Sequence, residues 1–76
     1  MIERLRALRE DRDLTQQDLA ELLHVHQSTY SDYELERINI PIRTLKRLAE
    51  FYQTSVDYIL GLTDEARPYP RKRQTP

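Results

Sequence analysis

Apolar residues recur every three or four positions along residues 1–64, and they nowhere alternate strictly with polar ones for long. Because an α-helix has 3.6 residues per turn, this spacing places the apolar side chains on one side of each helix, whereas a strand would need a period of two. The pattern therefore predicts an all-α fold. A chain of 76 residues has room for about one domain, so we expect a single compact bundle.

Start and stop signals divide this pattern into five short helices. The first runs to about Arg12, the second follows Thr15, the third runs from Gln27 to about Leu35, the fourth begins at Pro41, and the fifth runs from Val56 to Leu60. Thr15 and Asp18 have the spacing of a capping box. Thr54 or Ser55 is placed to cap the fifth helix. Gly61, the only glycine, stands where a left-handed residue ends that helix.

The composition limits how this bundle can be stabilised. The chain has no cysteine, so neither disulfides nor thiolate metal sites can reinforce it. A core of this size supplies only about 3–5 kcal/mol, which leaves helix packing or oligomerisation to add the rest. No apolar run approaches the roughly 18 residues that a membrane span needs, and no signal segment opens the chain. We therefore expect a cytoplasmic protein without a membrane segment.

The formal net charge of −1 hides an uneven distribution. Residues 1–66 hold eight basic and thirteen acidic side chains, a balance of −5, whereas residues 67–76 hold four basic and no acidic ones, a balance of +4. Prolines in that last segment lack amide donors and restrict their neighbours. We therefore assign residues 1–64 to the folded domain and residues 65–76 to a basic, proline-rich, disordered tail. The tail is either a simple solvated end or an arm that contacts phosphates.

The second and third predicted helices are separated by three or four residues, which is the arrangement of a helix-turn-helix. Residues 15–34 read TQQDLAELLHVHQSTYSDYE. This segment closely resembles the XRE-type family of phage-repressor and Cro-like DNA-binding domains, whose pattern is roughly T-Q-x-x-L-A-x-x-x-G-V-x-x-x-x-I-x-x-[YW]-E. Residues 2–9 and 41–61 are similar to that family's first helix and last two helices. The resemblance implies a compact five-helix, lambda-repressor-like domain whose third helix enters the major groove of duplex DNA.

The chain departs from the family pattern at three positions. Asp13 and His24 stand where the family commonly has glycine, at places where the backbone tends to a positive φ. Asn, Asp and His are the other residues most often found there, so we expect a left-handed backbone at both, with about 1 kcal/mol of strain each. Tyr30 replaces the usual Ile or Val and brings a hydroxyl that needs a partner or water.

Polar residues of the third helix are the candidates for contacting base edges. They are Gln27, Ser28, Ser31 and Asp32. Glutamine can bond adenine N6 and N7 together, serine can donate or accept, and a carboxylate can accept from cytosine N4. The spacing alone equally fits an ordinary solvent-facing surface, and it is the resemblance that assigns base contacts to these two turns. The carboxylate of Asp32 needs a cytosine or an arginine beside it, because phosphates repel it.

Contacts to DNA phosphates are expected at the starts of the second and third helices and beyond the third. The candidates are Thr15, Gln16, His26, Arg37 and Arg43. The resemblance also implies that Arg9 and Glu34 form a partly buried ion pair between the first and third helices. From the residues alone, two exposed charges that contribute little to stability are an open alternative.

A single recognition helix covers only a few base pairs, so the resemblance implies a homodimer on a palindromic operator in double-stranded DNA. Tyr58 and Leu62 remain near the surface after Val56, Ile59 and Leu60 are assigned to the core, and they are candidates for the dimer interface. Scattered exposed apolar residues are the alternative. The function we expect is transcriptional regulation, as a repressor. The acidic balance of residues 1–66 instead favours an antitoxin-like or other protein-interaction module that binds DNA secondarily.

Neither a metal site nor catalysis is indicated. His24 and His26 are two residues apart, with no cysteine and no obvious third ligand, so they fit turn residues better than a metal pair. Ser28 or Ser31 would need a base and an orienting acid in a pocket before it could act as a nucleophile. We therefore expect no enzymatic activity, no metal and no cofactor.

Overall fold

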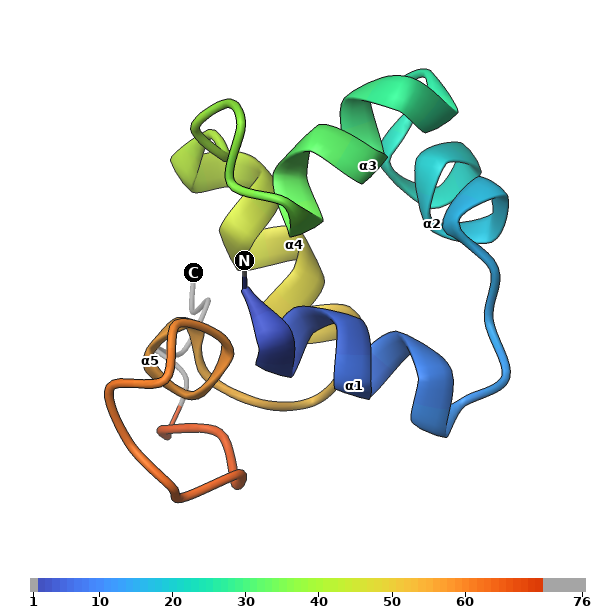
Figure 1. Ribbon diagram of the computed structural model, residues 1–76. Coiled ribbons are helices and arrows are strands. Elements are labelled where there is room, and N and C mark those ends of the chain that lie inside the picture. Colours follow the sequence, from blue (N-terminus) through green and yellow to red (C-terminus); the bar gives the residue numbers. More distant parts are fainter. Residues whose placement is uncertain (1, 71–76) are drawn as a thin grey trace, which may run out of the picture.

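The computed structural model describes residues 2–70 (Figure 1). Over that range the chain forms no strand and five helices: α1 (Glu3–Asp11), α2 (Gln16–Leu23), α3 (Gln27–Glu34), α4 (Ile42–Phe51) and α5 (Val56–Ile59). α2 packs against α3, α4 packs against α5, and α1 contacts both α3 and α5. The predicted all-α, five-helix fold is confirmed. None of the described helices is long and apolar enough to cross a membrane.

Side-chain caps fix where two of the helices begin. The Asp18 N–H donates to Thr15 Oγ1 at 3.0 Å, and the Thr15 N–H donates to Asp18 Oδ2 at 2.8 Å. This reciprocal pair is the predicted capping box. At α5 the cap is Ser55, whose Oγ accepts from the Tyr58 N–H at 3.0 Å. Thr54 is not the cap, because its hydroxyl donates to the carbonyl of Ala66 at 2.6 Å instead.

A left-handed residue follows each of the five helices, directly after α2 and two residues after the end of each of the others. These residues are Asp13, His24, Glu36, Gln53 and Gly61, with φ between 54° and 77°. The N–H that follows each of them donates to a carbonyl five positions earlier, as Val25 does to Ala20 at 3.0 Å. This bond satisfies a carbonyl that the helix end would otherwise leave open. The left-handed backbone predicted at Asp13, His24 and Gly61 is confirmed, whereas Glu36 and Gln53 have no residue type that favours it.

Replacing Gln53 by glycine is expected to raise the free energy of unfolding by about 1 kcal/mol, because glycine lacks the Cβ that strains a left-handed backbone. Gln53 is exposed at the end of α4. Gln53→Ala is the matched control, since it removes the same polar group but keeps the Cβ, and it should give no gain. Urea unfolding of the three proteins measures the difference. Equal midpoints for the glycine and alanine variants would contradict this account.

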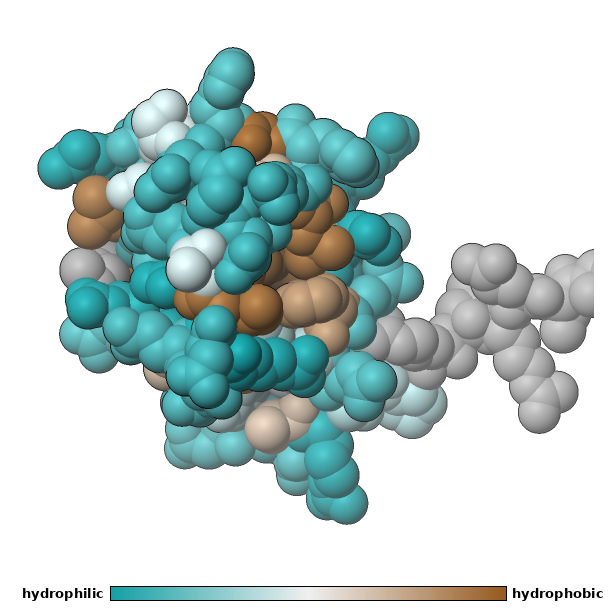
Figure 2. Space-filling model, turned by 90° about the vertical axis from the view of Figure 1, so that its right-hand side faces the viewer, coloured by the Kyte–Doolittle hydropathy of each residue, from teal (hydrophilic) through white to brown (hydrophobic). Residues whose placement is uncertain are grey.

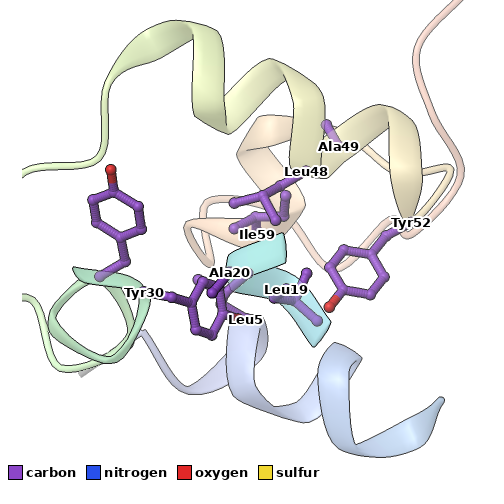
Figure 3. Packing of buried hydrophobic residues seen from close by; sticks show 9 residues of the cluster. Leu5, Leu19, Ala20, Tyr30, Leu48, Ala49, Tyr52 and Ile59 are labelled. Atoms are coloured by element: carbon purple, nitrogen blue, oxygen red, sulfur yellow. The ribbon is translucent and has the colours of Figure 1, made fainter. Parts of the chain in front are cut away.

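Buried side chains from all five helices form one core. They are Leu5, Leu19, Ala20, Tyr30, Tyr33, Leu48, Ala49, Tyr52 and Ile59. Figure 3 shows Leu5, Leu19, Ala20, Leu48 and Ile59 gathered between the helices, with the rings of Tyr30 and Tyr52 on either side of them. Tyr30 is fully buried, and its hydroxyl and that of Tyr52 have no hydrogen-bond partner among the described residues. Burial raises the pKa of Tyr30 and raises the pKa of Tyr52 to about 12, so both stay protonated.

Each helix buries one side in this core and leaves the other side to solvent. Figure 2 shows the face on the side of the molecule where α2 lies, and this face is largely hydrophilic with apolar patches near its middle. Side chains on these outer sides are therefore available for contacts with another molecule.

Arg4 of α1 holds the end of α5. Its Nη1 donates to the carbonyls of Tyr58 at 3.1 Å and Thr63 at 2.6 Å. The guanidinium carbon also lies 4.2 Å from the centroid of the Tyr58 ring. A cation at these carbonyls offsets the negative end of the helix and satisfies acceptors that the helix leaves open.

Part of the segment after Asp64 contacts the bundle. Besides the bond from Thr54 to Ala66, the Tyr69 hydroxyl donates to Asp57 Oδ2 at 2.9 Å. Two residues of the predicted disordered tail thus contact the bundle, Ala66 at the residue before the α5 cap and Tyr69 at α5 itself. Residues 71–76 of that tail lie outside the described residues.

Candidate nucleic-acid interface

The turn between α2 and α3 sets the angle between the two helices. His24 has φ 57° and ψ 44°, and His26 then returns to an extended conformation before α3 begins. The bond from Val25 to Ala20 holds the turn against α2. Two short helices joined by such a turn form a helix-turn-helix, in which the second helix is free to present its outer side.

α3 has a buried side and an outer side. Tyr30, Tyr33 and Glu34 are only 0%, 5% and 3% exposed, so they fix the helix to the rest of the bundle. The four candidates for base contact lie on the other side. Gln27 and Ser28 are exposed, while Ser31 and Asp32 are half-buried. The structure thus brings the four together over two successive turns of one helix.

Asp32 has an arginine close to it. Arg37 Nη1 lies 3.8 Å from Asp32 Oδ1, and the Arg37 N–H donates to the Asp32 carbonyl at 2.9 Å. The Arg37 side chain is 71% exposed, so the pair is loose and solvated. This arginine reduces the repulsion that an isolated carboxylate would meet beside phosphates.

A buried carboxylate, Glu34, ties three helices together behind this surface. Arg9 donates to it twice, from Nε at 2.7 Å and from Nη2 at 3.3 Å, and Gln16 Nε2 donates at 3.3 Å. The side chains of Arg9 and Glu34 are 12% and 4% exposed. The ion pair expected from the sequence is therefore present and is shielded from water on both sides.

The surroundings of Glu34 decide its charge. Burial alone would raise the pKa of Glu34, but the hydrogen bonds to its carboxylate, with Arg9 first among them, outweigh that effect and hold the pKa below its ordinary value. The bond to Glu34 in turn raises the pKa of Arg9. Both groups therefore stay charged at neutral pH.

The candidates for phosphate contact occupy different settings. Thr15 uses its hydroxyl in the capping box, while Gln16 directs one amide hydrogen to Glu34 and has a second one to offer. His26 precedes α3, is exposed and makes no capping bond with its side chain. Arg37 and Arg43 are exposed beyond α3. The structure therefore leaves donors at both ends of the helix-turn-helix.

Sequence reasoning missed Arg47. It lines a shallow hollow with His24 and Arg43, between the end of α2 and the outer side of α4. The spacing of four between Arg43 and Arg47 was the available signal, because residues four apart share one side of a helix. This hollow adds a second cation beside Arg43.

The candidates for a dimer interface differ in their exposure. Leu62 is 74% exposed, whereas Tyr58 is half-buried beneath Arg4. Leu60, assigned to the core from its spacing, is 43% exposed, so that assignment was wrong. It follows the last residue of α5, where the chain has already turned away from the core. Leu60 and Leu62 thus provide the apolar surface at this end.

His24 and His26 are exposed residues at the turn. Among the described residues, no group of three or more His, Cys, Asp or Glu side chains is arranged to hold a metal ion. Their places, one in the left-handed turn and one before α3, account for both of them as turn residues.

Residues 5–59, from α1 to the end of α5, match a family model described as helix-turn-helix. This chain belongs to that family. The resemblance to XRE-type domains that residues 15–34 carry is thereby confirmed. The match includes all four candidates for base contact and the Arg9–Glu34 pair.

Two helix-turn-helix relatives show the extent of the likeness. YobD of Bacillus subtilis (strain 168), an HTH-type transcriptional regulator, is 47% identical over 66 residues, which are 87% of this chain and 59% of that protein. The crystal structure of a transcriptional regulator from Listeria innocua is 31% identical with a TM-score of 0.76, over 86% of this chain and 61% of that chain. The chain thus spans 59% and 61% of the lengths of these two proteins.

Proposed function

We propose that this helix-turn-helix domain binds double-stranded DNA in a sequence-specific manner and acts as a transcriptional repressor. The observation that carries the proposal is the division of α3, whose buried side is fixed in the bundle while its outer side presents the candidate base contacts. A helix held in this way can enter the major groove as a rigid element. The two relatives, both transcriptional regulators by name, support this function.

In this proposal α3 contacts bases and its surroundings contact the backbone. Gln27 and Ser28 in the first turn, with Ser31 and Asp32 in the next, meet base edges. Thr15, Gln16, His26, Arg37 and Arg43 meet phosphates and fix the register of the helix. Because residues 1–66 carry a balance of −5, affinity depends on a few placed contacts, and the salt dependence is modest.

A dimer completes the proposed repressor. One recognition helix selects too few base pairs to define a genomic site, so two copies bind half-sites related by a two-fold axis. Tyr58 and Leu62, at the end of α5, are the proposed contacts between the copies. The proposal also implies a cytoplasmic protein without enzymatic activity.

Selection of duplexes from a random library, with separation of bound DNA by gel shift, tests the proposed function. Recovery of a palindromic consensus supports a dimeric, sequence-specific regulator. If the protein retains duplexes without enriching any sequence, sequence-specific recognition is excluded. If it retains no duplex, DNA binding itself is excluded.

Gln27→Ala is expected to cost about 1–3 kcal/mol on the selected site and to relax the preference at one base pair, because a bidentate contact to a base edge is lost. Arg43→Ala, the comparison variant, should weaken binding to all sequences alike, since a phosphate contact carries no sequence information. Titration of both variants against the selected site and single-base variants of it gives the answer. Equal losses across sequences for Gln27→Ala would exclude its role in base recognition.

A second candidate function, an antitoxin-like or other protein-binding module, is favoured by one feature. Ile38 and Leu60 are each 43% exposed and line a hollow with the apolar side chains of Ile2, Ile40 and Leu45. Together with the acidic balance of residues 1–66, this surface fits a protein partner better than DNA. The library selection separates the two functions, since a module that binds DNA only secondarily would enrich a consensus weakly on its own.

A further inference from the structure

α1, α2 and α3 enclose a polar hollow beside the proposed recognition surface. It is lined by Arg6, Arg9, Gln16, Ser31, Glu34 and Leu35. Ser31 is one of the proposed base contacts, and Gln16 is one of the proposed phosphate contacts. A DNA strand that meets both α3 and the start of α2 therefore passes over this hollow.

The two arginines of the hollow, Arg6 and Arg9, differ in how far their guanidinium groups are already engaged inside the protein. Arg9 donates to Glu34 from Nε and Nη2 and to the Leu14 carbonyl from Nη1 at 3.0 Å, so all three of its nitrogens are engaged inside the protein. Its charge is balanced by the buried carboxylate. Arg9 therefore supports the hollow but has little left to offer a ligand.

Arg6 is the cation on the rim that can change partners. Its only described ion pair is with Glu10, one turn along α1, with Nε 3.3 Å from Oε2. The two side chains are 50% and 54% exposed, and such a solvated pair is weak. A phosphate offers the planar guanidinium a stronger, charge-assisted and bidentate partner.

We propose that Arg6 is a further positioning residue, which binds a phosphate of the DNA strand that passes α1, and that Glu10 occupies the guanidinium in place of this phosphate when DNA is absent. The inference rests on the proposed function, since it needs duplex DNA on α3. It adds α1 to the elements that hold the DNA backbone and gives Glu10 an opposing role.

The experiment measures binding to a random-sequence duplex over a range of salt concentrations, because phosphate contacts do not depend on sequence. Arg6→Gln is expected to weaken binding about five- to tenfold at 0.1 M salt and to reduce the slope of log K against log salt by about 0.9, the share of one phosphate. Lys46→Gln is the matched control. Lys46 is an exposed residue of α4 that does not line the hollow, and its loss changes the net charge equally.

Glu10→Gln tests the opposing role and keeps Arg6 in place. It is expected to strengthen duplex binding about threefold or more, beyond the effect of Glu50→Gln, which makes the same change of charge at an exposed position of α4 away from the hollow. Circular dichroism shows whether Arg6→Gln folds. If it does not fold, Glu10→Gln still tests whether Arg6 contacts a phosphate.

The outcomes separate this inference from the proposed function. If Arg6→Gln has the affinity and slope of Lys46→Gln, or if Glu10→Gln matches Glu50→Gln, the role of Arg6 is overturned and the proposed function stands. If the parent chain binds no duplex even at low salt, both are overturned. A loss confined to Arg6→Gln, with a gain confined to Glu10→Gln, supports the contact.

Discussion

Arg9→Ala is expected to lower the free energy of unfolding by about 3–5 kcal/mol, because it leaves the charge of Glu34 buried without its main partner. The Glu34 side chain is only 4% exposed, so water cannot replace the guanidinium. Arg6→Ala removes a solvated pair and should cost less than about 1 kcal/mol. Since a core of this size supplies only about 3–5 kcal/mol in total, the Arg9 variant should be largely unfolded near room temperature.

Urea and thermal unfolding of both variants, followed by circular dichroism, measures this difference. Adding Glu34→Gln to Arg9→Ala should recover part of the lost stability, because the buried group is then neutral. Matching midpoints for the Arg9 and Arg6 variants would show that the ion pair is solvated and contributes little.

The Arg9–Glu34 ion pair also predicts how the stability of the fold depends on pH. The folded-state pKa of Glu34 lies below its ordinary value, so its contribution is fully present above the unfolded pKa of about 4.3. This contribution to stability is lost as the pH falls through the lower pKa that Glu34 has in the folded state. In Arg9→Ala, burial acts on Glu34 without the opposing bond from Arg9 and should raise its pKa. The destabilisation by Arg9→Ala should therefore shrink as the pH falls toward 4, which unfolding curves at several pH values would show.

The fold could be predicted because its signals are local. The helical spacing of apolar residues and the capping box of Thr15 and Asp18 act within one or two turns of the chain. The left-handed backbone at Asp13 and His24 was predicted from a family pattern that has glycine there and from residue types that tolerate a positive φ. Glu36 and Gln53 adopt the same conformation without either signal, and the backbone bonds from Arg37 to Asp32 and from Thr54 to Ala49 close their helix ends in the same way.

Contacts between distant parts of the chain were beyond sequence reasoning. Arg4 covers Tyr58, 54 positions later, and so removes part of the apolar surface that the spacing of α5 suggests. Gln16 directs its amide to Glu34, which no local pattern encodes. The place of Arg6 at the hollow depends in the same way on the packing of α1 against α3. Only the three-dimensional arrangement shows which exposed residues share a surface.

Leu62→Glu is expected to abolish cooperative occupation of the two half-sites and to leave the fold of the single domain intact. The side chain is 74% exposed, so a charge there costs the folded monomer little. The backbone bond from the Leu62 N–H to the Asp57 carbonyl, 2.8 Å long, does not depend on the side chain. In the proposed dimer the same carboxylate would lie against the apolar end of the second copy, where an unpaired charge is costly.

The expected loss is about 100-fold in affinity for a site with both halves and less than about threefold for a single half-site, because only the linkage between the copies is removed. Footprinting on the selected operator shows this as loss of the second protected half-site, about 10 base pairs from the first. Gln53→Glu adds the same charge at another exposed position and is the control for repulsion from DNA. If Leu62→Glu binds as cooperatively as the parent, the copies meet elsewhere, and the hollow lined by Ile38 and Leu60 is the next surface to test in the same way.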